Sequence, residues 1–81
     1  MKVIDIQRGY IKVRCHDRTA TIAGEALLPG FGSPSFVANL NSLVAWDPPF
    51  ESQLLDEDMK RKIIGCIISD FKSKDMIIEF Q

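Results

Sequence analysis

The residues that most often carry catalysis and metal binding are scarce in this sequence. Its 81 residues include one histidine and two cysteines, and the cysteines lie far apart at positions 15 and 66. A protein zinc site needs three or four such ligands at short spacing, and a small secreted protein needs more cysteines to build a disulfide framework. We therefore expect two free thiols in a reducing compartment, and no bound metal, no cofactor and no catalytic residue.

An excess of one charge and long apolar runs are absent as well. The formal net charge is −1, whereas a general nucleic-acid-binding surface requires a basic excess. No apolar run approaches the roughly 20 residues of a membrane-spanning helix, and the opening residues show no secretory signal. We expect one cytoplasmic domain over residues 1–81, with no membrane partner and no direct nucleic-acid partner.

Cys15 and His16 are neighbours in the sequence and have the chemistry of a nucleophile and its base. Adjacent residues of a strand point to opposite faces, so these two side chains are not expected to reach each other. A thiolate nucleophile also needs a third group that orients the base, and none is evident. The sequence therefore favours a protein that is not an enzyme.

Apolar and polar residues alternate through the first third of the chain. Alternation over residues 2–7, 10–16 and 18–25 predicts a three-stranded antiparallel meander with one buried face. We expect turns at residues 8–9, where a glycine supplies a positive φ, and at residues 16–17. The side chains expected on the buried face are Ile4, Ile6, Ile11, Val13, Cys15, Ala20 and Ile22.

The rest of the chain predicts a loop, short strands, one helix and a last strand. Prolines and glycines indicate a loop over residues 27–35, in which Phe31 would be a core anchor or an exposed contact, and residues 36–46 predict one or two short strands. An apolar stripe at the helical period predicts an amphipathic helix over residues 56–72, and residues 76–80 predict a strand. The expected fold is α+β, with an antiparallel sheet of about five strands packed against one helix near the C-terminus, in the order β-β-β-β-α-β. The apolar stripe consists of Met59, Ile63, Ile64, Ile67, Ile68 and Phe71.

Charged and aromatic residues are distributed unevenly. Residues 2–18 hold five bases and two acids, whereas residues 47–58 hold five acids and no base. Such a split can steer a charged partner, although acids also stabilise the start of a helix. Phe50 suits an interface as well as the core, and Trp46 favours the core. The candidate binding residues are Asp47, Phe50, Glu51, Glu57 and Asp58.

Four pieces of the sequence are informative together. They are Ile6-Gln7-Arg8, Ala23-Gly24-Glu25, Trp46-Asp47-Pro48-Pro49, and the amphipathic helix with its short final strand. Together they resemble a family of very small, mostly β immunity proteins encoded beside bacterial polymorphic toxins, including those of contact-dependent growth inhibition. The resemblance implies a cytosolic protein that binds the C-terminal domain of a cognate toxin, often a nuclease, and neutralises it by steric block or by binding beside its active site.

Other functions stay open from the residues alone. The basic N-terminal hairpin, with Tyr10 as a stacking platform, would suit a small nucleic-acid-binding or regulatory module. A small enzyme or an enzyme subunit is the third alternative. Free strand edges at residues 76–80 or in the first strand would also allow a homodimer.

Overall fold

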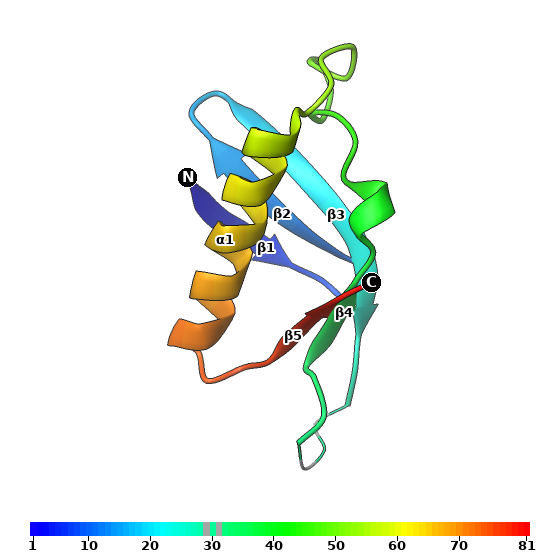
Figure 1. Cartoon of the computed structure of the whole chain (residues 1–81), viewed down its shortest axis with the longest axis vertical. Helices are drawn as coiled ribbons and strands as arrows, with labels where there is room; N and C mark the ends of the chain where they lie inside the picture. The colour runs from blue at the N-terminus through cyan, green and yellow to red at the C-terminus, as the bar shows by residue number, and fades with distance from the viewer. Residues whose placement is uncertain (29, 31) are drawn as a thin grey trace.

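The chain folds into one mixed sheet with a single long helix on one face (Figure 1). The structure is a computed structural model, and it describes residues 1–28, 30 and 32–81. The predicted element order β-β-β-β-α-β is confirmed. The elements are β1 (Lys2–Ile6), β2 (Tyr10–Cys15), β3 (Arg18–Ala26), β4 (Phe36–Ala38), the short 3-10 helix η1 (Leu40–Ser42), α1 (Glu57–Ser73) and β5 (Ile78–Phe80).

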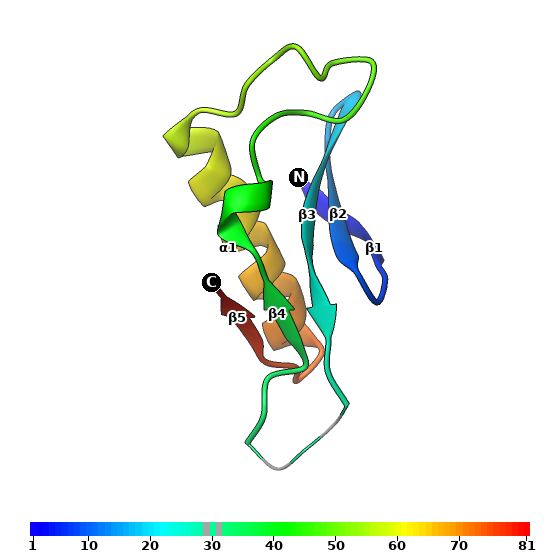
Figure 2. The same ribbon diagram turned by 90° about the vertical axis from the view of Figure 1, so that its right-hand side faces the viewer.

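The strands lie in the order β1-β2-β3-β4-β5, so β1 and β5 form the two edges (Figure 2). The first four strands pair antiparallel, but β5 pairs parallel with β4, and Ile78 lies opposite Phe36. The expectation of a fully antiparallel sheet is therefore wrong for the last pair. The reason is the long connection through α1, because a crossover of this kind returns the chain in the same direction.

A β-bulge in β1 changes which of its residues face the core. Val3 pairs with Val13 and Asp5 pairs with Lys12, and the register shifts between them. Val3 therefore packs against the core, whereas Ile4, which was predicted to be buried, is 43% exposed. The extra residue of a bulge reverses the alternation of side chains from that point along the strand.

The two hairpin connections differ in their backbone conformations. The predicted turn at His16 and Asp17 is confirmed, and His16 adopts a positive φ of 59°. Gly9 does not adopt the positive φ that was predicted for it. The chain still turns at Arg8 and Gly9 as predicted, because the N–H of Gln7 donates to the carbonyl of Tyr10 at 2.8 Å. The carbonyl of Gly9 accepts a hydrogen bond from the N–H of Gly24 in β3 at 3.0 Å.

The core lies between α1 and the inner face of the sheet. Ile11, Val13, Ala20 and Ile22 are buried as predicted, and Cys15 is half-buried. From β4, the ring of Phe36 meets the ring of α1 residue Phe71 edge to face, with centroids 6.3 Å apart. Phe71, Ile63 and Ile67 form the buried line of the helix, flanked by the half-buried Met59 and Ile64. Ile68 was predicted to be buried, but it lies at the margin of this line and is 46% exposed.

Helix α1 begins at the N-cap residue that the sequence predicts. Asp56 is the N-cap, and its carboxylate accepts a hydrogen bond from the N–H of Met59 at 2.7 Å. Glu57 and Asp58 follow in the first turn, where the helix dipole favours acidic side chains. The predicted helix is therefore confirmed to within one residue at each end. No helix among the described residues is both long and apolar enough to cross a membrane.

The segments that flank β4 agree in part with the expectations. The described residues of the predicted loop join β3 to β4, and Leu27 donates its N–H to the carbonyl of Ser35 at 2.9 Å. Phe31, named as an anchor or an exposed contact, lies outside the described residues. The second short strand is reduced to an isolated bridge between Ala45 and Leu54.

The C-terminal end of α1 is closed by two hydrogen bonds across a left-handed residue. The N–H of Met76 donates to the carbonyl of Phe71 at 2.9 Å, and the N–H of Asp75 donates to that of Lys72 at 3.2 Å. Asp75 has a φ of 58°, at the position where glycine is preferred because a Cβ is strained there. This is a Schellman motif with an aspartate in the place of the usual glycine.

Replacing Asp75 with glycine is expected to stabilise the fold. The variant removes the left-handed strain and keeps both closing hydrogen bonds, so the free energy of unfolding should rise by about 0.5–1 kcal/mol. Urea denaturation followed by circular dichroism measures the change. Asp75→Ala is the matched control, because alanine removes the carboxylate but keeps the strained Cβ. Equal stability of the glycine and alanine variants would contradict the prediction.

Candidate functional site

The candidate binding residues lie together at one end of the molecule. The chain measures 40 Å along its longest axis and 20 Å along each of the others. Figure 1 shows the connection from η1 to α1 at the upper end of this axis, beside the turn between β2 and β3. We call this end the acidic tip and define it as residues 16–18 and 46–58.

Asp47 fastens the tip to strand β3. Its Oδ2 atom accepts hydrogen bonds from the hydroxyls of Thr19 and Thr21, at 2.7 and 2.8 Å. Its N–H also donates to the carbonyl of Thr19 at 2.8 Å. The preceding residue, Trp46, is buried in the core as predicted, with 9% of its surface exposed. The Asp47 carboxylate therefore already has partners inside the protein.

Arg18 and Phe50 hold the middle of the tip. The guanidinium of Arg18 lies over the ring of Phe50, 4.4 Å from its centroid, and donates a hydrogen bond to the side-chain oxygen of Gln53. Its Nε atom lies 3.6 Å from a carboxylate oxygen of Asp17. Phe50 is half-buried and packs against the core, so one side of the ring anchors the segment.

The remaining candidate acids are exposed to solvent. Glu51 makes no ion pair within the described part of the chain. Glu57 lies 3.6 Å from the ammonium of Lys60, and Asp58 lies 3.3 Å from that of Lys62. Pairs this exposed stabilise a fold by little, so the carboxylates remain free to meet another charge. Leu54, 74% exposed, adds an apolar side chain among them.

Asp17 belongs to the same surface, although sequence reasoning did not include it. The contacts of Arg18 with Gln53 and Phe50 bring the β2–β3 turn beside residues 47–58. The Asp17 side chain is 74% exposed. No local pattern could have shown this, because residues 17 and 51 are far apart in the chain. The exposed acids of the tip are Asp17, Glu51, Asp56, Glu57 and Asp58.

A shallow groove enters the tip between the β2–β3 turn and the start of α1. It measures about 390 Å³ and is lined by Cys15, His16, Asp17, Arg18, Trp46 and Met59. No hydrogen bond between Cys15 and His16 occurs in the described structure, and His16 is exposed. No cluster of three metal-ligating side chains is found among the described residues. The groove offers shape and charge for binding.

The outward side chains of the basic N-terminal hairpin lie on the sheet face opposite α1. Its aromatic residue, Tyr10, already contacts other side chains of the same chain. The ammonium of Lys12 lies 5.8 Å from the centroid of the Tyr10 ring. The Tyr10 hydroxyl donates to Asp5 at 3.2 Å, and this hydrogen bond raises the pKa of the phenol above its ordinary value. A base that stacked on this face of the Tyr10 ring would have to displace the Lys12 ammonium.

Comparison with known protein families shows a similarity over nearly the whole chain. The family described as Immunity protein 74 matches residues 3–81. No curated protein and no solved structure matches it.

Proposed function

The chain belongs to the Immunity protein 74 family, and from this membership we propose that it binds and neutralises the C-terminal domain of a cognate bacterial toxin in the cytosol. The observation that carries the proposal is the acidic tip, an exposed end of the molecule that concentrates carboxylates around Phe50 and Leu54. The activity needs binding and no catalytic step. The toxin is encoded next to its immunity protein in a polymorphic toxin or contact-dependent growth inhibition system.

The charge of the tip suits a nuclease. A nuclease must present a basic surface to its polyanionic substrate, and exposed carboxylates complement such a surface. Charge complementarity also speeds the encounter, which benefits a protein that must act before the toxin does. Occupation of the nucleic-acid-binding surface would block the active site sterically.

The internal contacts of the tip support a role in binding. The Asp47–threonine hydrogen bonds and the Arg18–Phe50 stack hold residues 46–53 against β3 in the free protein. A surface held in this way loses little conformational entropy when a partner binds. A standard interface of about 800 Å² per partner would take a modest share of the 5465 Å² of accessible surface.

Charge reversal at the tip is expected to weaken toxin binding. In the double variant Glu51→Lys, Asp58→Lys, we expect an affinity at least about tenfold lower, mainly through slower association, because steering depends on the summed charge. The measurement is surface plasmon resonance with a catalytically inactive form of the toxin domain encoded immediately upstream. Growth rescue of cells that express the active toxin provides a second readout.

The control must carry the same change in net charge at another place. Glu25→Lys, Glu79→Lys changes the charge equally at the end of the sheet away from the tip, and both side chains are exposed. This control should bind at a rate close to that of the unchanged protein. If both double variants slow association equally, net charge rather than the tip governs binding. If the unchanged protein neither binds nor protects, the proposed function is wrong.

A further inference from the structure

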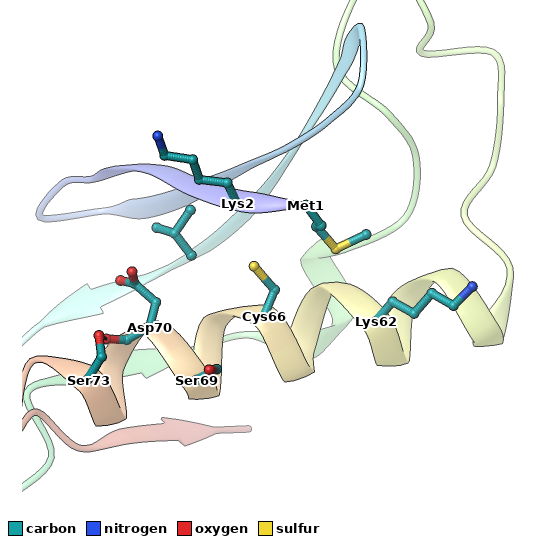
Figure 3. A pocket seen from close by; sticks show the side chains of 8 residues that line it. Met1, Lys2, Lys62, Cys66, Ser69, Asp70 and Ser73 are labelled. Carbon is teal, nitrogen blue, oxygen red and sulfur yellow. Dashed lines mark hydrogen bonds between the residues drawn. The ribbon is translucent and has the colours of Figure 1, made fainter.

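A second groove runs between the edge strand β1 and helix α1. Its volume is about 580 Å³. Figure 3 shows that Cys66 and Asp70 point from the helix toward β1, whereas the side chain of Lys2 points away from the helix. We call it the β1–α1 groove. Its lining residues are Met1, Lys2, Val3, Lys62, Cys66, Ser69, Asp70 and Ser73.

The strand side of this groove offers unpaired backbone groups. The N–H of Gly24 donates to the carbonyl of Gly9. The backbone groups of the odd-numbered residues of β2 therefore hydrogen-bond to β3, and those of the even-numbered residues hydrogen-bond to β1. Arg14 therefore pairs with Lys2 through backbone hydrogen bonds. Alternate residues of a strand turn their backbone groups to opposite sides, so the N–H and C=O of Val3 point away from β2 at the free edge of the sheet.

On the helix side of the groove, small side chains leave space beside the free edge of β1. Three of the helix side chains that line the groove, Cys66, Ser69 and Ser73, are small. The opposite flank of the helix carries the bulky Ile64 and Ile68 instead. A free strand edge next to a helix face with small side chains has the geometry in which an extended peptide adds to a sheet.

Asp70 gives the groove a chemical preference. Its Oδ2 atom is buried and accepts no hydrogen bond within the described structure. The same oxygen forms an ion pair with the ammonium of Lys74 at 3.0 Å, in which the Lys74 side chain is 51% exposed and the Asp70 side chain is 25% exposed. An ion pair this exposed stabilises the fold by little, so a basic group of a partner can take the place of Lys74 beside Asp70 in a charge-assisted hydrogen bond.

We propose that the β1–α1 groove receives an extended segment of the toxin as a sixth strand, with a lysine or arginine beside Val3 that reaches Asp70. The proposal rests on the proposed function and names a further part of the same interface. Residues opposite each other on neighbouring strands point to the same face, so a side chain beside Val3 points to α1 and Asp70. The bulge after Val3 limits the pairing to the start of β1. Lys62 lines the groove and pairs with Asp58, so the groove adjoins the acidic tip.

The backbone part of the proposal is tested by Val3→Pro against Val3→Ala. Proline removes the outward N–H but no hydrogen bond to β2, and proline is tolerated at such an edge position. Alanine keeps the N–H and removes more of the side chain than proline does, so lost packing alone would weaken the alanine variant at least as much. Against the inactive toxin domain, we expect Val3→Pro to bind about tenfold or more weakly than Val3→Ala. Equal affinity of the two variants would overturn the strand pairing.

The charge part is tested by Asp70→Asn, which keeps the shape of the side chain. We expect roughly ten- to hundredfold weaker toxin binding, because a charge-assisted hydrogen bond is lost. Lys74→Met is the control, since it removes the internal partner and leaves Asp70 free, and it should bind at least as tightly as the unchanged protein. Unchanged affinity in Asp70→Asn would overturn the role of Asp70.

Amide hydrogen exchange gives a readout that does not depend on a variant. On binding of the inactive toxin domain, exchange of the Val3 amide should slow at least about tenfold, as expected for a new ladder hydrogen bond. An unchanged Val3 amide in a tight complex would overturn the groove proposal and leave the immunity function standing. Protection that rises with concentration without toxin would assign the edge to a second copy of this chain, as a homodimer, and would also overturn it. Failure of the unchanged protein to bind any toxin would overturn both.

Discussion

Replacing Gly24 with alanine is expected to lower the free energy of unfolding by at least about 3 kcal/mol. A Cβ at this position would lie 2.5 Å from Cε1 of Phe36 and 2.9 Å from the Cα of Ala38, and it would also clash with the carbonyl oxygen of Val37. Two of these atoms belong to the backbone of β4, so they cannot move without separating β4 from β3. Urea denaturation and the melting temperature should both report the loss.

Gly65→Ala provides the control for this substitution. Gly65 lies on the exposed face of α1, and a Cβ there would meet nothing within 4 Å. Alanine has the higher helix propensity, so the variant should be more stable by up to about 1 kcal/mol. The contrast between the two glycines separates close approach of strands from a general effect of glycine replacement. Wild-type stability in Gly24→Ala would show that β4 can lie farther from β3.

Replacing Asp47 with alanine is expected to cost about 2–3 kcal/mol of stability. The change removes the acceptor shared by the hydroxyls of Thr19 and Thr21 and detaches the tip from β3. Hydrogen bonds to a charged group are stronger than neutral ones, so Asp47→Asn should be intermediate. Chemical denaturation measures the three proteins, and the difference between them gives the contribution of the charge.

A double-mutant cycle identifies the source of this effect. In a background of Thr19→Val and Thr21→Val, the Asp47→Ala change should cost much less, because its hydrogen-bonding partners are already absent. An unchanged cost in that background would place the importance of Asp47 elsewhere. Charge reversal at Asp47 would alter the fold and the surface together, so it would not isolate an effect on toxin binding.

The correct predictions came from local patterns. Helix α1 was located because its apolar stripe, its N-cap Asp56 and its acidic first turn all lie within one stretch of the chain. The meander over β1–β3 and the turn at residues 16–17 followed from the alternation of neighbouring residues. Burial of Trp46 followed from its size in a chain of 81 residues. For the helix and the meander, the controlling interactions join residues that are close in sequence.

The sequence by itself thus determined the elements, their order and the family resemblance, which the match to the Immunity protein 74 family confirms. Only the tertiary structure decided the parallel pairing of β5, the place of Asp17 in the tip, the hydrogen bonds of Asp47 and the groove beside Val3. The difference has a physical cause. Hydrophobic periodicity and helix caps depend on residues within a few positions of one another. Strand pairing, bulges and grooves depend on how distant segments pack, and a local pattern does not determine that packing.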